Sequence, residues 1–263
     1  MPKEIEAKFL DIEIEEYRET LKQNGCTLVH ENRLLRRSVF RRCDETVKGY
    51  CRVRDEVGGV TMTSKIYTAD SKYADEYEVS INESYEDGTK FLESLGLIKK
   101  AYQESYREKW CHPLAKEITI DILPGLPPYS EIECKTENEL NKMIEILKLD
   151  KSKMRFGAFD KTYNEYYDIP TDIINNKTPS LTFENIINEI KPIKNQDLLQ
   201  KIYELYKPKK ISRNKSKKSS RKSSRKKSKK SSRKKSKKSS RKGSRKGSRK
   251  KSKKSSRKGS RKI

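Results

Sequence analysis

The segment Glu4-Ile5-Glu6-Ala7-Lys8-Phe9, close to the N-terminus, alternates charged and apolar residues. A period of two is typical of a β-strand, because successive side chains along a strand point to opposite faces of the sheet. One face of this strand would carry only charged groups and the other only apolar ones. The same alternation recurs in Arg52-Val53-Arg54, Glu76-Tyr77-Glu78, Thr119-Ile120-Asp121 and Glu131-Ile132-Glu133.

Two interpretations of this charged face are open. For a single strand, a solvated outer face is the simpler one. Across five strands, however, the charges are grouped by sign within each strand, and like charges two residues apart repel each other. Paired carboxylates suit a hard divalent cation, and paired arginines suit phosphate oxygens. The pattern therefore favours a sheet that closes with its charged face inward, around a polar tunnel, and packs its apolar face against outer helices.

Turn signals and apolar spacing predict a strand-rich α+β fold. Gly58-Gly59 is a strong two-residue hairpin signal between two of the strands. There is no βαβ alternation and no glycine-rich phosphate loop, which argues against a Rossmann or P-loop nucleotide fold. Strands are expected over 3–9, 50–57, 60–67, 75–82, 102–110, 116–123 and 130–135, and helices over 14–24, 88–95 and 138–148.

The formal net charge of +25 is divided unevenly along the chain. Residues 207–263 hold 32 of the 63 Lys and Arg residues and none of the 38 Asp and Glu residues, so residues 1–206 carry a net charge of −7. This Lys/Arg/Ser-rich tail is of low complexity and is predicted to be disordered. We expect it to bind nucleic acid non-specifically, since no aromatic residues accompany its charges. A nuclear-targeting signal and adhesion to an anionic membrane are the alternatives.

The remaining composition predicts an intracellular protein, cytoplasmic or nuclear and not secreted. No apolar run reaches the length of about 18 residues that suggests a membrane span. The N-terminal sequence lacks the apolar region of a secretory signal. The five cysteines are scattered and form no CxxC pair, which argues against a disulfide framework or a zinc site.

Residues 176–206 have a different pattern and are predicted to form a short helical extension. Apolar residues at helical spacing indicate two short amphipathic helices, with Asn195 as the candidate cap of the second. We expect both to pack on the outside of the barrel, and a partner-binding motif is the alternative. Their apolar residues are Phe183, Ile186, Ile187 and Ile190 in the first and Leu198, Leu199, Ile202 and Leu205 in the second.

Taken in order, the motifs resemble those of the CYTH, or triphosphate tunnel metalloenzyme, family. The resemblance runs through most of residues 1–165, and its strength lies in the order of seven motifs, each of which is weak alone. The chain departs from the family at Ser105, where a lysine is frequent, and over 29–42, which matches no pattern. The motifs are ExExK at residues 4–8, RxR at 52–54, MTSK at 62–65, ExE at 76–78, Arg107, Asp121 followed by Glu131-Ile132-Glu133, and Lys161-x-Tyr163.

The resemblance implies an eight-stranded antiparallel closed barrel with helices packed outside, formed by a tunnel domain over residues 1–175. It implies Mg²⁺ or Mn²⁺ as cofactor and no organic cofactor. Residues implied to bind the triphosphate are Lys8, Arg52, Arg54, Lys65 and Arg107, with Lys161 closing one end of the tunnel. Residues implied to bind metal are Glu4, Glu6, Asp121, Glu131 and Glu133, with Glu76 and Glu78 as candidates for a water-held second ion or for orienting the basic residues.

The function implied is metal-dependent phosphoryl transfer, with hydrolysis of a triphosphate as the first expectation. The substrate would be an inorganic, nucleoside or thiamine triphosphate or an RNA 5′ end. The alternatives are a class IV-type adenylate cyclase, which the stretch at residues 124–133 mildly favours, and a non-catalytic polyphosphate- or nucleotide-binding module. The motifs do not choose among these and predict no oligomeric state.

Overall fold

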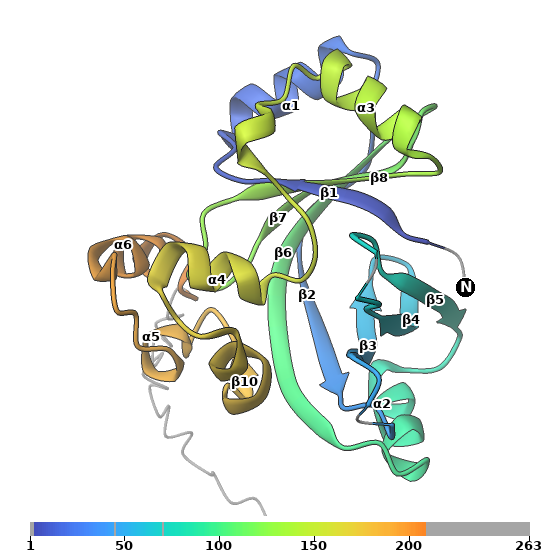
Figure 1. The fold of residues 1–263 in the computed structure, drawn as a ribbon, viewed down its shortest axis with the longest axis vertical. Helices are drawn as coiled ribbons and strands as arrows, with labels where there is room; N and C mark the ends of the chain where they lie inside the picture. The colour runs from blue at the N-terminus through green and yellow to red at the C-terminus, as the bar shows by residue number, and fades with distance from the viewer. Residues whose placement is uncertain (1–2, 45, 70, 209–263) are drawn as a thin grey trace, which may run out of the picture. The chain divides into compact units, whose positions relative to one another are not determined.

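The fold is known from a computed structural model that describes residues 3–44, 46–69 and 71–208. An antiparallel sheet with the order β5-β4-β3-β2-β6-β7-β8-β1 curls through the molecule (Figure 1). A bridge between Lys3 and Asp75 joins the β1 end of this sheet to the β5 end. The eight strands are β1 (Ile5–Phe9), β2 (Thr27–Phe40), β3 (Gly49–Glu56), β4 (Gly59–Ile66), β5 (Asp75–Ile81), β6 (Lys99–His112), β7 (Ala115–Ile122) and β8 (Tyr129–Cys134).

The predicted eight-stranded antiparallel barrel with outer helices is thereby confirmed, with two short strands in addition. β9 (Met154–Arg155) extends the sheet beyond β1, and β10 (Ser180–Leu181) pairs with β6 in parallel. The sequence did not reveal β2, although it spans 14 residues. Its pairing with β6 shifts register three times, and each irregularity interrupts the alternation by which a strand is recognised.

Helices α1 (Ile14–Gln23) and α3 (Glu137–Ile146) cover the apolar face of β1, β7 and β8 (Figure 1). α2 (Tyr85–Ser94) packs against β3 and β4. α2 and α3 begin at capping side chains, because Ser84 Oγ accepts a hydrogen bond from the Asp87 amide and Thr136 Oγ1 accepts one from the Glu139 amide. The apolar faces of β1, β3, β4, β7 and β8 are thus covered by helices, whereas Tyr77 and Val79 of β5 remain exposed. The charged faces turn toward the interior.

The segment after β9 packs on the sheet as well. It contains α4 (Asp160–Tyr167), a π-helical turn (Ile173–Lys177), α5 (Ile186–Glu189) and α6 (Gln196–Tyr206). The predicted apolar stripes face the core, since Phe183, Ile186, Ile190, Leu199 and Ile202 are all at most 5% exposed. The first predicted helix is reduced to the single turn α5. Asn195 does not cap α6 through its side chain, which instead donates to the Tyr166 carbonyl at 2.7 Å.

The Pro124–Pro128 turn is the point at which this segment meets the barrel. Gly125 has a φ of +78°, and a Cβ there would come within 2.6 Å of Leu199 Cδ1, so only glycine fits. The Tyr163 hydroxyl donates to the Pro124 carbonyl at 2.5 Å, and the Tyr167 hydroxyl donates to the Gly125 carbonyl. The turn is therefore a packing element between the barrel and α4–α6.

This packing predicts a large loss of stability for Leu199→Ala. Leu199 is 4% exposed, and the variant should lower the free energy of unfolding by about 2–5 kcal/mol in urea denaturation. Leu205→Ala on the same helix is the matched control, since Leu205 is 67% exposed and should change stability by less than about 0.5 kcal/mol. Equal effects of the two substitutions would contradict the packing of α6 on the barrel.

The 207–263 tail was predicted to be disordered and to bind nucleic acid. Its residues from 209 onward lie outside the described part of the chain, so both statements stay predictions. Within the part of the chain that is described, no helix combines the length and the apolar character that crossing a bilayer requires.

Candidate active site

The charged faces of the strands line an interior cavity of about 390 Å³. Its five buried cations, which are between 5% and 9% exposed, are Lys8, Arg52, Arg54, Lys65 and Arg107. They come from β1, β3, β4 and β6, and they are the five residues that the motifs predicted to bind phosphate. The charged face is thus interior, and the alternative of a solvated outer face is wrong for these strands.

Each of these cations contacts a carboxylate. Lys8 Nζ lies 2.9 Å from Glu131 Oε1. Lys65 Nζ lies 3.0 Å from Glu76 Oε2 and also contacts Glu4. Because charged groups removed from water require partners, these pairs keep the interior charged without a large desolvation cost.

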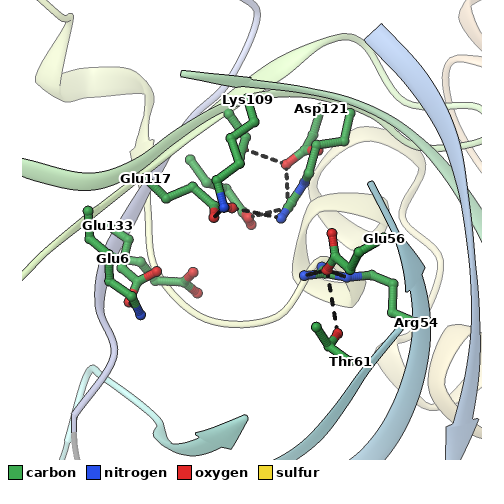
Figure 2. Close-up of polar contacts among 12 residues, drawn as sticks. Glu6, Arg54, Glu56, Thr61, Lys109, Glu117, Asp121 and Glu133 are labelled. Carbon is green, nitrogen blue, oxygen red and sulfur yellow. Dashed lines mark hydrogen bonds and ion pairs between the residues drawn. The ribbon is translucent and has the colours of Figure 1, made fainter. Parts of the chain in front are cut away.

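The two arginines on β3 are held in the same way. Arg52 Nη2 lies 3.0 Å from Glu78 Oε2, and Glu78 also accepts a hydrogen bond from Thr63. Burial opposes ionisation of Glu78, but Arg52 and Arg54 outweigh it and lower the pKa of Glu78 to about 2. Arg54 contacts Glu56, as Figure 2 shows. Glu78 therefore serves as an ion-pair partner of the arginines.

Arg107 is the most heavily bonded cation of the cavity. Its Nε and Nη2 donate to the two oxygens of Asp121, both at 2.7 Å, in a bidentate pair. Its guanidinium also donates to Glu117 at 3.0 Å and to Glu131 at 2.9 Å. Asp121 and Glu131, which were predicted to bind metal, are therefore engaged by cations in this structure.

Three carboxylates form a row across β1, β8 and β7. Glu6 pairs in register with Glu133, and Glu133 pairs in register with Glu117 (Figure 2). Like charges directly opposite each other on a sheet are destabilising. Burial raises the pKa of Glu133, and the charges of Glu117 and Glu6 raise it further although Lys116 opposes them. Cations neutralise part of the row, since Lys116 contacts Glu133 at 2.6 Å, and Arg107 and Lys109 outweigh burial and lower the pKa of Glu117. The repulsion is therefore felt most at Glu133, the middle member of the row.

Glu4 extends this acidic region along β1. Burial and the neighbouring Glu6 raise its pKa from an ordinary 4.5 to about 8, even though Lys65 acts in the opposite direction. Glu4, Glu6 and Glu133 supply the hard oxygen ligands that Mg²⁺ and Mn²⁺ prefer. A bound divalent cation would stabilise the ionised carboxylates of Glu4 and Glu133, which burial and neighbouring negative charge disfavour, so the donor set fits such an ion. Within the described ranges, no three Asp, Glu, His or Cys side chains lie close enough together to hold a metal ion as they stand.

A pair of positively charged arginines lines the same cavity. Arg37 of β2 lies directly across from Arg54 of β3, so two cations face each other inside the protein. Burial lowers the pKa of both arginines, and their positive neighbours, including Arg52, lower it further. This arginine pair is the place where an anion would be most stabilised.

The structure brings together all but two of the predicted site residues in the lining of this cavity. Asp121 lies behind the lining, bound to Arg107. Lys161 is exposed on α4 and lines a neighbouring, larger cavity. Arg37 and Glu117 were missed. Glu117 continues the alternation of Thr119 and Asp121 by two more residues and could have been found from that signal, whereas Arg37 lies in the irregular strand β2.

The raised pKa of Glu4 predicts a stability that falls with pH in the absence of divalent metal. Because the folded state holds the Glu4 proton more tightly than the unfolded state, the contribution is full below pH 4.5 and is lost as the pH rises through about 8. Melting temperatures measured in a chelator from pH 5 to 9 should therefore decline, and Glu4→Gln should flatten that decline since an amide mimics the neutral acid. An unchanged pH profile in Glu4→Gln would contradict the assignment.

Comparison with known proteins supports the fold. No family model and no curated protein matches the sequence. Among solved structures, a "putative adenylate cyclase" from Vibrio parahaemolyticus matches with a TM-score of 0.50 and 16% identity, over 61% of this chain and 97% of that one. A Pyrococcus horikoshii protein matches with a TM-score of 0.47 and 22% identity, over 62% and 98% of the two chains.

A third match is a "putative adenylyl cyclase" from Hippeastrum, which is described as having a dominant triphosphatase activity. Its TM-score is 0.43 and its identity 13%, over 62% of this chain and 94% of that one. Of the three, the Vibrio parahaemolyticus match, with its TM-score of 0.50 and 16% identity, indicates similarity of fold and nothing finer. The chain therefore has the fold that its motifs predicted from their resemblance to the CYTH family, a curled antiparallel sheet with helices packed outside and a charged interior.

Proposed function

We propose that this protein is a divalent-metal-dependent enzyme that hydrolyses a triphosphate. The observation that carries the proposal is the presence of two clusters of like charge in one cavity, the carboxylate row of Glu6, Glu133 and Glu117 and the arginine pair of Arg37 and Arg54. A triphosphate with its metal ion would complement both features at once. The cavity volume of about 390 Å³ lies within the range of about 300–1,000 Å³ typical of small-molecule sites.

The basic residues would bind the phosphate oxygens. Arg52, Arg54 and Arg37 present guanidinium groups whose planar N–H donors match phosphate oxygens, and Lys8 and Lys65 add point charges. Burial of these donors excludes water and strengthens each contact as charge develops during phosphoryl transfer.

The acidic residues would hold the metal and the attacking water. Glu4, Glu6 and Glu133 are the proposed metal ligands, and Glu117 joins them as a further candidate. A bound ion would neutralise charge on the phosphate oxygens and so make the phosphorus more open to attack by water. Asp121 and Glu131, which bind Arg107, would position that arginine rather than the ion.

An adenylate cyclase of the class IV type is the second candidate. The fold match to a "putative adenylate cyclase" supports it. The stretch at residues 124–133, which favoured it in the sequence, is a weaker argument now, because the Pro124–Pro128 turn packs against Tyr163 and Tyr167.

One assay separates the candidates. The purified full chain is incubated with tripolyphosphate, ATP, thiamine triphosphate or a 5′-triphosphorylated RNA, each with Mg²⁺ or Mn²⁺. Release of phosphate is the result expected for hydrolysis. Formation of cyclic AMP with pyrophosphate would establish the cyclase instead, and binding of these ligands without turnover would overturn both in favour of a non-catalytic module.

A further inference from the structure

A second cavity, of about 1140 Å³, lies beside the first. The two share a wall, to which Arg37, Tyr50, Tyr67 and the 157–159 segment contribute. Seven basic side chains line it, of which only Arg37 also lines the first cavity: Arg37, Arg41, Arg42, Lys48, Lys72, Lys100 and Lys161. Three of them, Arg37, Arg41 and Arg42, come from the 29–42 segment, which matched no pattern of the family.

Most cations of this cavity differ from the five buried cations of the first in having no ion-pair partner among the described residues. Each of the five buried cations of the first cavity contacts a carboxylate. In the second cavity Lys72 pairs with Glu137 at 3.0 Å, and within the described ranges the other six cations have no carboxylate oxygen within 4.0 Å. The three acidic residues of the described lining are hydrogen-bonded or paired to other side chains, although the charge of Asp160 still acts on Lys100 and that of Arg42 on Asp44. Asp172 pairs with Lys177 at 3.0 Å, Asp160 accepts a hydrogen bond from Asn175 at 2.8 Å, and Asp44 accepts from Thr46.

Two of the guanidinium groups hold unused donors in buried positions. Arg37 Nε donates to Gln103 at 2.8 Å, but its buried Nη2 has no hydrogen-bond partner among the described residues. Arg42 Nη1 donates to Ser64 at 2.9 Å, and its buried Nε likewise lacks a partner there. A buried donor without an acceptor costs about 1–3 kcal/mol, so these two groups favour a ligand that supplies acceptor oxygens.

Lys100 completes the site from β6. Burial lowers the pKa of its ammonium, and the charge of Arg41 lowers it further. A cation whose ionisation is disfavoured by neighbouring cations is stabilised when an anion binds between them.

We propose that this larger cavity is a second phosphate-binding site, which takes a phosphate or phosphodiester group on Arg37, Arg42 and Lys100. The group would come either from free phosphate or from the part of a longer substrate that continues beyond a triphosphate held in the first cavity. The second source rests on the proposed function, whereas the site itself does not. Because Arg37 lines both cavities, it would contact both anions.

The test uses the full chain and reads lysines individually, so that anion binding by the basic tail does not obscure it. Surface amines are acetylated under limiting reagent, and the modified lysines are quantified by mass spectrometry. Lys100 should be protected at least about fivefold by saturating ligand. Lys99, the exposed neighbour on the same strand, is the internal control and should be unaffected. The probes are inorganic phosphate, tripolyphosphate, and one oligonucleotide with and without a 5′ triphosphate.

Protection by inorganic phosphate would identify a free anion as the occupant. Protection by the 5′-triphosphorylated oligonucleotide alone would identify the occupant as a phosphodiester group of a longer substrate whose triphosphate lies in the first cavity. Arg42→Ala should abolish the protection in either case while leaving the KM for tripolyphosphate hydrolysis unchanged, and Lys90→Ala, an exposed charge on α2, is the control. No protection of Lys100 by any probe, or equal protection of Lys99, would overturn this proposal. The tripolyphosphate kinetics test the proposed function separately.

Discussion

Arg54→Ala is expected to lower kcat/KM for triphosphate hydrolysis by about 10²–10³-fold, the usual effect of removing one preorganised donor from developing charge. Arg54 is 7% exposed, lines the tunnel cavity and faces Arg37 across the sheet. The measurement is steady-state phosphate release with tripolyphosphate or ATP, whichever is the better substrate, at saturating metal.

The stability of Arg54→Ala without ligand distinguishes this role from a structural one. The substitution removes the repulsion between Arg37 and Arg54, and burial already lowers the pKa of Arg54. Because the substitution also removes the ion pair with Glu56, the two effects oppose each other, and the melting temperature should change little while activity falls. Arg36→Ala is the matched control, because Arg36 lies one position from Arg37 on β2 but bonds Asp55 and Glu86 outside the cavity. Activity of Arg54→Ala within about threefold of the wild type would remove Arg54 from the site.

Glu133→Gln is expected to weaken divalent-metal binding by about 100-fold, since loss of even an outer partner of a metal ligand costs about 10–100-fold. Glu133 stands in the middle of the carboxylate row, between Glu6 and Glu117. Calorimetric titration of Mn²⁺ into the protein measures this loss directly. Activity titrated with Mg²⁺ should show the same shift in metal requirement, with partial recovery at high metal concentration.

Glu131→Gln provides the contrast on the same strand. Glu131 bonds Lys8 and Arg107, which outweigh its burial and lower its pKa. Its charge therefore stabilises the fold, and the Glu131→Gln variant should melt at a lower temperature. Glu133→Gln should instead melt at a higher temperature in a chelator, since burial and like charges raise the pKa of Glu133. Equal metal affinity of Glu133→Gln and the wild type would show that the carboxylate row is not the metal site.

The strands with unbroken alternation were predictable from the sequence, and so were the residues they carry. β1, β3, β4, β5, β7 and β8 all lie within two residues of their predicted bounds. The five cations predicted to bind phosphate share one cavity, because a period of two places every second side chain on the same face.

Other features of the fold and of the site could not be predicted from strand alternation. β2 was not predicted because its pairing with β6 is irregular. Arg37, which lies on β2 and lines both cavities, was missed for the same reason. Helix α4 was missed, so Lys161 was assigned to the tunnel although it lines the larger cavity. The sequence also did not determine which carboxylates would form ion pairs with the arginines and lysines. Asp121 and Glu78 became ion-pair partners, whereas Glu133 remained in a row of like charges.

The sequence by itself determined that acidic and basic side chains are sorted by strand onto one face, because strand periodicity is a local property of the chain. It also determined that the net charge of +25 arises from the tail and not from the folded body. Only the tertiary structure decided which charges balance each other. That balance depends on strand order and register, which bring Glu6, Glu133 and Glu117 into one row and set Arg37 opposite Arg54. These two clusters of like charge mark the proposed sites for metal and phosphate.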